Sequence, residues 1–199
     1  MVLAIVAIAA SYLLGSITFS FVVAKWWKGI DIRKHGSGNA GATNTLRVLG
    51  KGAAITVLAL DVGKGIAAVW LGRWLGDTPV IEVACGLAAI IGHNWPVFFG
   101  FRGGKGIATT IGVMATLHFV PALLAGIIAI LSIVLTRYVS LGSLLFTCLT
   151  PLALWLLDYP TTYIWSALMI FAFALLRHRS NVTKLLRGEE NKLGAKRGM

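Results

Sequence analysis

The stretch Ile107–Thr136, IATTIGVMATLHFVPALLAGIIAILSIVLT, decides how this chain folds. It holds no Asp, Glu, Lys or Arg, so it belongs in an apolar environment. As one helix rising ~1.5 Å per residue it would extend about 45 Å, well beyond the ~30 Å hydrocarbon core of a bilayer. The stretch is therefore either one long kinked helix or two short helices that turn near His118–Pro121. The two alternatives give different topologies.

The rest of the chain is also strongly apolar. Of its 199 residues, 57% are hydrophobic and only 13% are charged, against about 45–50% and about 25% in soluble domains. We therefore expect a polytopic membrane protein that forms one membrane-embedded domain over residues 1–199. Other apolar segments predict helices at about Val2–Val23, Ala53–Leu75, Val80–Ile91, Leu141–Leu157 and Thr161–Leu176.

The distribution of basic residues chooses between the two topologies. The net charge is +11, and Lys and Arg gather in the polar loops 25–51 and 92–106, at Arg137, and in the tail from Arg177 onward. Cytoplasmic segments of membrane proteins are enriched in Lys and Arg. Only the two-helix alternative places all four segments on one side. We predict an all-α polytopic membrane protein with seven transmembrane helices, its N-terminus outside and its C-terminus in the cytoplasm.

The first polar loop contains HGSGNAGATNTLR at residues 35–47. Gly36, Gly38 and Gly41 match the spacing GxGxxG, but no strand precedes them and no βαβ unit surrounds them, which excludes a dinucleotide fold. Glycines let backbone N–H groups approach an anion closely, and Arg47 can bind a phosphate through two hydrogen bonds. Neutral polar side chains complete the loop: Ser37, Asn39, Thr43 and Asn44. We interpret it as an anion-binding loop, with an ordinary interfacial loop as the alternative.

The second polar loop, GHNWPVFFGFRGGKG at residues 92–106, resembles a P-loop only in part. That motif needs Gly at position 99 and Ser or Thr at position 106, where this chain has Phe99 and Gly106. Lys105 still lies among glycines, beside Gly103 and Gly104, and a following helix would add its positive N-terminal potential. The alternative for Lys105 is a membrane-surface anchor. His93 is either a base or an interfacial histidine.

Three smaller features carry polar groups in or beside apolar segments. Ser143 follows Arg137 at the start of a predicted helix, and taken alone it predicts a helix cap. The tail RHRSNVTKLLRGEE (177–190) brings His178 and Asn181 to the cytoplasmic side, with a basic membrane flank as the alternative. Asp61 and Lys64 stand at i and i+3 inside an apolar segment, which predicts a structural ion pair.

The composition also argues against several classes of site. The chain has seven acidic residues, and the predicted cytoplasmic segments contain no carboxylate cluster. We therefore expect no metal and no other cofactor. Aromatic residues are not interleaved with a basic surface, so we expect no nucleic acid partner. No carboxylate in the cytoplasmic motifs is placed to orient a histidine, so we expect no serine nucleophile of the triad type.

The motifs in this order resemble those of the PlsY family of bacterial membrane acyltransferases. They are GSGNAGATN with Arg47, GHNWPVFFGFRGGKG, SLGS after Arg137, and HRSN followed by RGEE. The resemblance implies transfer of an acyl group from acyl phosphate to glycerol 3-phosphate. The products are phosphate and 1-acyl-glycerol 3-phosphate (lysophosphatidic acid), at the first step of phospholipid synthesis. It further implies seven helices in the bacterial plasma (inner) membrane, a site facing the cytoplasm, and no metal.

The resemblance also assigns roles to residues at matching positions. It implies that the catalytic residues are Ser37, Arg47, Lys105, His178 and Asn181. It implies that further residues bind substrate: Gly36, Gly38, Asn39, Asn44, His93, Gly103, Gly104 and Ser143. Because an acyl phosphate is already activated, we expect direct transfer without an acyl-enzyme, with Ser37 as a hydrogen-bond donor to phosphate.

Two other classes of function remain open from the residues. An organophosphate transporter or anion channel would also use basic glycine-rich loops, but a permeation path needs polar residues on both faces of the membrane. The predicted outer connections are short and have few polar groups. A protein that only binds anionic lipid would leave three separate glycine- and asparagine-containing motifs unexplained.

Overall fold

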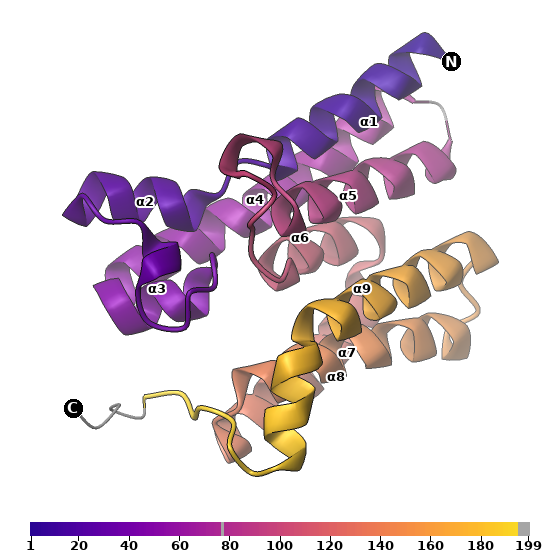
Figure 1. Cartoon of the computed structure of the whole chain (residues 1–199). Coiled ribbons are helices and arrows are strands. Elements are labelled where there is room, and N and C mark those ends of the chain that lie inside the picture. The colour runs from indigo at the N-terminus through magenta and orange to yellow at the C-terminus, as the bar shows by residue number, and fades with distance from the viewer. Residues whose placement is uncertain (77, 195–199) are drawn as a thin grey trace. The chain divides into compact units, whose positions relative to one another are not determined.

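The computed structural model describes residues 1–76 and 78–194 (Figure 1). These residues form helices and no strand, which confirms the predicted all-α class. Two short 3-10 helices, η1 (Ile32–Lys34) and η2 (Val97–Phe99), lie in the polar loops. The α-helices of the described residues are α1 Val2–Gly15, α2 Phe19–Lys28, α3 Ala42–Leu49, α4 Lys51–Leu75, α5 Pro79–Asn94, α6 Ile107–Leu117, α7 Phe119–Thr136, α8 Val139–Leu156 and α9 Thr161–Leu186.

The stretch that decides the fold is broken into two helices, as the two-helix alternative predicts. Helix α6 ends at Leu117 and α7 begins at Phe119. His118 between them has φ −155° and ψ 80°, which is not helical. Pro121 falls in the first turn of α7, where its missing N–H costs no helical hydrogen bond.

Two predicted helices differ from the structure by more than a few residues at their ends. The single helix expected over Val2–Val23 is wrong, because the chain turns at Ile17 and Thr18 between α1 and α2. The backbone N–H of Ser16 closes the last turn of α1 on Tyr12, and Thr18 leaves the helical region. The last helix, expected to end at Leu176, continues to Leu186. Arg177–Leu186 contains no Gly or Pro, and Gly188, with φ +70°, follows the helix end.

Several helices are long and apolar enough to cross a membrane. Among the described residues there are five such segments, Val2–Lys28, Lys51–Leu75, Pro79–Phe99, Phe119–Thr136 and Val139–Leu156. Helix α6 is apolar but shorter. The chain is therefore an all-helical protein whose segments suit a bilayer.

The described residues form two compact units, which are Met1–Leu117 and the part from His118 onward. In the first unit, α4 and α5 pack against each other and both pack against α1 and α6 (Figure 1). Small residues allow this, because a Cβ at Gly15 would collide with the backbone of Ala89, and one at Gly65 with the backbone of Thr109. In the second unit α8 packs against both α7 and α9.

The predicted ion pair in α4 is confirmed. The Lys64 ammonium lies 2.8 Å from Oδ1 of Asp61, and both side chains are only 1% exposed. Lys64 also donates a hydrogen bond of 2.8 Å to the carbonyl of Ile17, in the break between α1 and α2. The pair therefore connects the middle of α4 to the point where the chain turns between α1 and α2.

Candidate functional site

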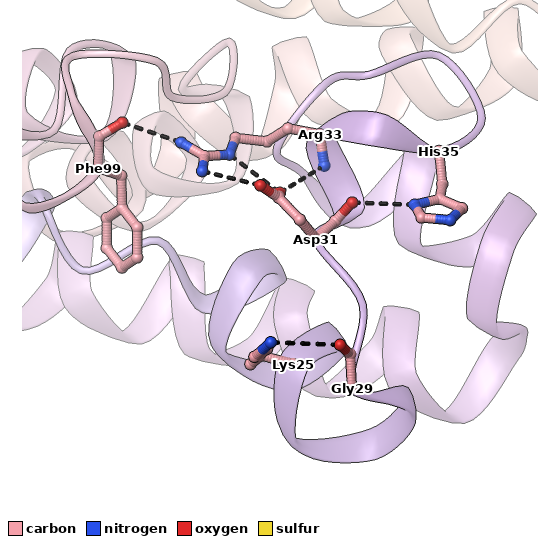
Figure 2. A network of polar contacts seen from close by, with 6 residues as sticks. All are labelled: Lys25, Gly29, Asp31, Arg33, His35 and Phe99. Atoms are coloured by element: carbon pink, nitrogen blue, oxygen red, sulfur yellow. Dashed lines mark hydrogen bonds and ion pairs between the residues drawn. The ribbon is translucent and has the colours of Figure 1, made fainter.

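The segment that leads into the first loop is fixed by an arginine and an aspartate (Figure 2). Asp31 accepts hydrogen bonds from the backbone N–H, Nε and one terminal nitrogen of Arg33, at 2.9–3.0 Å. The hydrogen bonds from Arg33 lower the pKa of the Asp31 carboxyl below its ordinary value. The other terminal nitrogen of Arg33 donates to the carbonyl of Phe99 at 2.9 Å, so this arginine ties the first polar loop to the second.

The glycine-rich turn that follows is organised by Asn44, which is 1% exposed. Its amide nitrogen donates to the carbonyls of Ile32 and His35, and its Oδ1 accepts the backbone N–H of Ser37 at 2.8 Å. Gly36 has φ +61°, and a Cβ there would collide with the Asn44 side chain. The predicted substrate-binding residue Asn44 therefore holds the loop through three backbone groups, and Gly36 makes room for it.

The side chains predicted to meet an anion lie on the outside of this turn. Ser37 and Gly38 are exposed, and Asn39 is partly exposed. The Oγ of Ser37 accepts only a long contact of 3.5 Å from the backbone N–H of Asn39. Arg47, in the last turn of α3, is also exposed. Unlike Arg33, it makes no ion pair with any described residue, so its guanidinium is available to a phosphate.

The second loop begins at the end of α5 and folds back on His93. The backbone N–H of Gly104 donates to the carbonyl of His93 at 3.1 Å. A Cβ at Gly103 would collide with that carbonyl, and one at Gly104 would collide with Nε2 of His93 and the carbonyl of Ala40. Because Ala40 belongs to the first loop, the two glycine-rich loops meet at Gly104.

Lys105 lies between this meeting point and the start of α6. It is partly exposed, and Gly106 after it has φ +82°, a conformation that favours glycine. Helix α6 begins at Ile107, so its N-terminal N–H groups follow Lys105 directly. A lysine and a helix N-terminus together make a positive potential suited to an anion.

The other predicted residues lie in the second unit. Ser143 is buried in α8 and donates to the carbonyl of Val139 at 2.8 Å. Its prediction as a helix cap is wrong, because Tyr138 is the N-cap residue of α8. His178 is buried in α9, and its Nδ1 lies 2.8 Å from the carbonyl of Ala174. Since a carbonyl only accepts, Nδ1 carries the hydrogen.

Asn181, also on α9, has a partner that the sequence reasoning did not identify. Its amide nitrogen lies 3.0 Å from both carboxylate oxygens of Glu190. Nearby, Arg137 donates to the carbonyl of Leu193, and the Leu193 N–H donates back to the Arg137 carbonyl at 2.7 Å. The RGEE motif and the residues after it therefore hold the end of α9. The signal that could have predicted this contact is the short distance in the sequence between the HRSN motif, which ends at Asn181, and the RGEE motif, which ends at Glu190.

Asp61, in the first unit, is a second residue whose contact with the site was not predicted from the sequence. The expectation that no carboxylate orients a histidine considered only the polar motifs. The structure places Oδ1 of Asp61, in the middle of α4, 3.5 Å from Nδ1 of His93. The packing of α4 on α5 brings the two residues together, and no local sequence pattern reports it.

The chain is similar in sequence to known proteins over nearly its whole length. Residues 5–188 match the family model described as glycerol-3-phosphate acyltransferase. A glycerol-3-phosphate acyltransferase of Shouchella clausii is 59% identical over 198 residues, covering 96% of this chain and 97% of the relative. One of Halalkalibacterium halodurans is 57% identical over 197 residues, covering 96% and 95%.

Two solved structures are also similar. Both are crystal structures of PlsY, an integral membrane glycerol 3-phosphate acyltransferase, and each is 41% identical to this chain. The glycerol 3-phosphate form gives a TM-score of 0.90 and covers 96% of both chains. The lysophosphatidic acid form gives 0.88 and covers 96% of this chain and 95% of the other.

Proposed function

This chain belongs to the glycerol-3-phosphate acyltransferase family, and from that premise we propose that it transfers an acyl group from acyl phosphate to glycerol 3-phosphate. It is a multi-pass membrane acyltransferase that acts on glycerol 3-phosphate in phospholipid synthesis. The products are lysophosphatidic acid and inorganic phosphate. The observation that best supports this function is the meeting of the two glycine-rich loops at Gly104, because they carry Ser37 and Lys105 respectively.

Both substrates of this reaction carry phosphate, so the protein needs to neutralise at least two anions. Arg47 and Lys105 provide the positive charge, while Ser37 and the backbone N–H groups near Gly36 and Gly38 provide neutral donors. His178 and Asn181 of the second unit position glycerol 3-phosphate, and Ser143 contributes to phosphate binding. The substrate-binding set is completed by Asn39, Asn44, His93, Gly103 and Gly104.

The chemistry needs neither a metal nor a covalent enzyme intermediate. The hydroxyl oxygen of glycerol 3-phosphate attacks the acyl carbonyl carbon, and the bond from that carbon to the bridging phosphate oxygen breaks. The hydroxyl proton passes to an oxygen of the departing phosphate. Fixed positive charge stabilises the developing negative charge, which is the effect with the largest contribution in many enzymes. Ser37 donates a hydrogen bond to phosphate and is not acylated.

The topology that we propose has seven membrane helices. The five long apolar segments supply five of them, α6 supplies a sixth, and the apolar first part of α9 supplies the seventh. The N-terminus lies outside and the basic segments, with the C-terminus, lie in the cytoplasm, because Lys and Arg are enriched there. The site then faces the cytoplasm from the inner membrane, and residues 1–199 act as one catalytic domain.

An assay with competing donors tests the function. Purified protein in detergent or liposomes is given labelled glycerol 3-phosphate with acyl phosphate, acyl-CoA or acyl carrier protein as donor. We expect labelled lysophosphatidic acid with acyl phosphate alone. Product from acyl-CoA or acyl carrier protein but not from acyl phosphate would overturn the proposed donor. Passage of glycerol 3-phosphate across liposomes without any product would support the alternative of a transporter or channel.

A further inference from the structure

A buried polar network in α4 has no role in the proposed reaction as described so far. Asp61 and Lys64 lie inside an apolar helix, where a charge removed from water is energetically costly. A carboxylate whose purpose is to neutralise a lysine needs one partner. Asp61 faces two, because the same Oδ1 atom lies 2.8 Å from the Lys64 ammonium and 3.5 Å from Nδ1 of His93.

The two edges of the His93 ring face different elements. Nδ1 faces Asp61 of α4, while the Nε2 edge lies against Gly104, where a Cβ would collide with it. The carbonyl of His93 also accepts the Gly104 N–H. His93 is 3% exposed, and its imidazole fills the space between the carboxylate and the loop that carries Lys105.

We propose that Asp61 is a positioning residue for the acyl transfer, acting through His93 on the loop of Gly104 and Lys105. The negative carboxylate attracts the Nδ1–H edge of the imidazole and so selects the tautomer with hydrogen on Nδ1. The ring then keeps its Nε2 edge toward Gly104, and the loop keeps the position from which Lys105 meets phosphate. The separation of 3.5 Å exceeds that of a full hydrogen bond, so the attraction is electrostatic.

Lys64 has a supporting part in the same network. Its ammonium balances the charge of Asp61, so His93 can stay neutral while it is held. Its hydrogen bond to the Ile17 carbonyl fixes the ammonium at the break between α1 and α2. The network thus runs from that break, through α4, to the second glycine-rich loop.

A positioning role for Asp61 and a purely structural ion pair with Lys64 predict different results when both charges are removed. If Asp61 served only to neutralise Lys64, removing both charges together would leave the reaction unchanged. If Asp61 positions His93, removing both charges still releases the ring. A misplacement of about 1 Å near the reacting groups can cost ~10²-fold in rate. We therefore expect kcat of Asp61→Asn/Lys64→Met to fall by ~10–100-fold, with KM values changed much less.

The chain offers a matched control for this double substitution. Arg73 of α4 and Glu82 of α5 form an ion pair of 2.8 Å between the same two helices, and Arg73 is exposed. Arg73→Met/Glu82→Gln removes one charge of each sign, as the test variant does. We expect it to keep kcat within ~3-fold of the unaltered protein, because exposed ion pairs contribute little to stability.

A cycle with His93→Gln shows whether Asp61 acts through the histidine. In that background we expect the Asp61→Asn/Lys64→Met substitutions to change kcat by less than ~3-fold, whereas independent roles would give losses that multiply. Multiplying losses, or a double variant as active as the Arg73/Glu82 control, would overturn the inference. The inference rests on the proposed function, whose failure is separate, since unaltered protein would then make no product from acyl phosphate.

A second measurement is made on the unaltered protein, and a variant is needed only to assign one signal. The ¹⁵N signals of the imidazole report which ring nitrogen carries hydrogen, and the chain has four histidines. The His93 signal is assigned by its absence from His93→Gln. We expect the Nδ1–H tautomer in the unaltered protein in detergent. An Nε2–H tautomer would contradict the proposed orientation whatever the kinetic results.

Discussion

The Gly104→Ala substitution adds one methyl group at the point where the two glycine-rich loops meet. That methyl would collide with Nε2 of His93 and the carbonyl of Ala40, and it would lie 3.1 Å from Cδ2 of His93. All three contacts involve groups that cannot rotate away, which are a backbone carbonyl and a buried ring. The loop itself must therefore move, by an amount on the order of 1 Å.

The size of the effect follows from that displacement. A shift of about 1 Å near the reacting atoms can cost ~10²-fold in rate, which corresponds to ~2.7 kcal/mol of transition-state stabilisation. Adding a methyl to a closely packed site also destabilises a fold by typically 1–3 kcal/mol. We therefore expect kcat for acyl transfer to fall ~10²-fold, with a lower melting temperature.

The control is Gly63→Ala in α4, where a Cβ meets nothing within 4 Å. Alanine is the better helix former by about 1 kcal/mol, so this variant should be at least as stable as the unaltered protein and as active. Both variants are purified in the same detergent, and kcat, KM and the melting temperature are measured. A Gly104→Ala variant with unaltered kcat would refute the argument that the loops are held by close packing at this glycine.

Further predictions concern charge, metal, topology and covalent chemistry. Lys105→Ala and Arg47→Ala should each lower the rate of acyl transfer by ~10²–10³-fold. Arg47→Lys should recover little of that rate, because the lysine ammonium lacks the planar guanidinium that makes two parallel hydrogen bonds. Near-normal rates in either alanine variant would contradict the assignment. Activity should survive EDTA, and strict dependence on added divalent metal would overturn the metal-free mechanism. A cysteine that replaces Ser37 or Gly188 should react with an impermeant thiol reagent from the cytoplasmic side, and one that replaces Thr78 should react from outside. Labelling of positions 37 and 188 from opposite sides would exclude the proposed topology. Labelled acyl phosphate alone should leave no label on denatured protein, and label that depends on Ser37 would disprove direct transfer.

The elements that the sequence predicts well are those encoded by local pattern. The break near His118 follows from the length of Ile107–Thr136 and the placement of basic residues around it. The Asp61–Lys64 pair follows from the spacing of two charges in an apolar helix. The end of α9 was misplaced because the prediction followed apolarity alone, although Arg177–Leu186 contains residues that also favour a helix.

The parts of the site that sequence did not predict depend on contacts between distant segments. Gly103 and Gly104 suggested close approach of backbone to an anion, and the structure shows that they allow close approach to His93 and Ala40. Asn44 was predicted to bind substrate, which stays a prediction, and the structure adds that its side chain makes three hydrogen bonds to backbone groups of its own loop. Which polar side chains hold the loops in place, and which remain exposed, depends on how the helices pack, and a local sequence pattern does not contain that information.

The apolar helix packing and the polar loops are parts of one arrangement, and α5 shows why. A Cβ at Gly92, one residue before His93, would collide with the carbonyl of Tyr12 in α1. The hydroxyl of Tyr12 donates to the carbonyl of Trp95 at 2.9 Å, just after α5 ends. The end of α5 is thus fixed from α1 on both sides of His93, and Asp61 holds the ring from α4. Substitutions that widen the contact between α1 and α5 should therefore disturb the loop of Lys105, although they lie outside every polar motif.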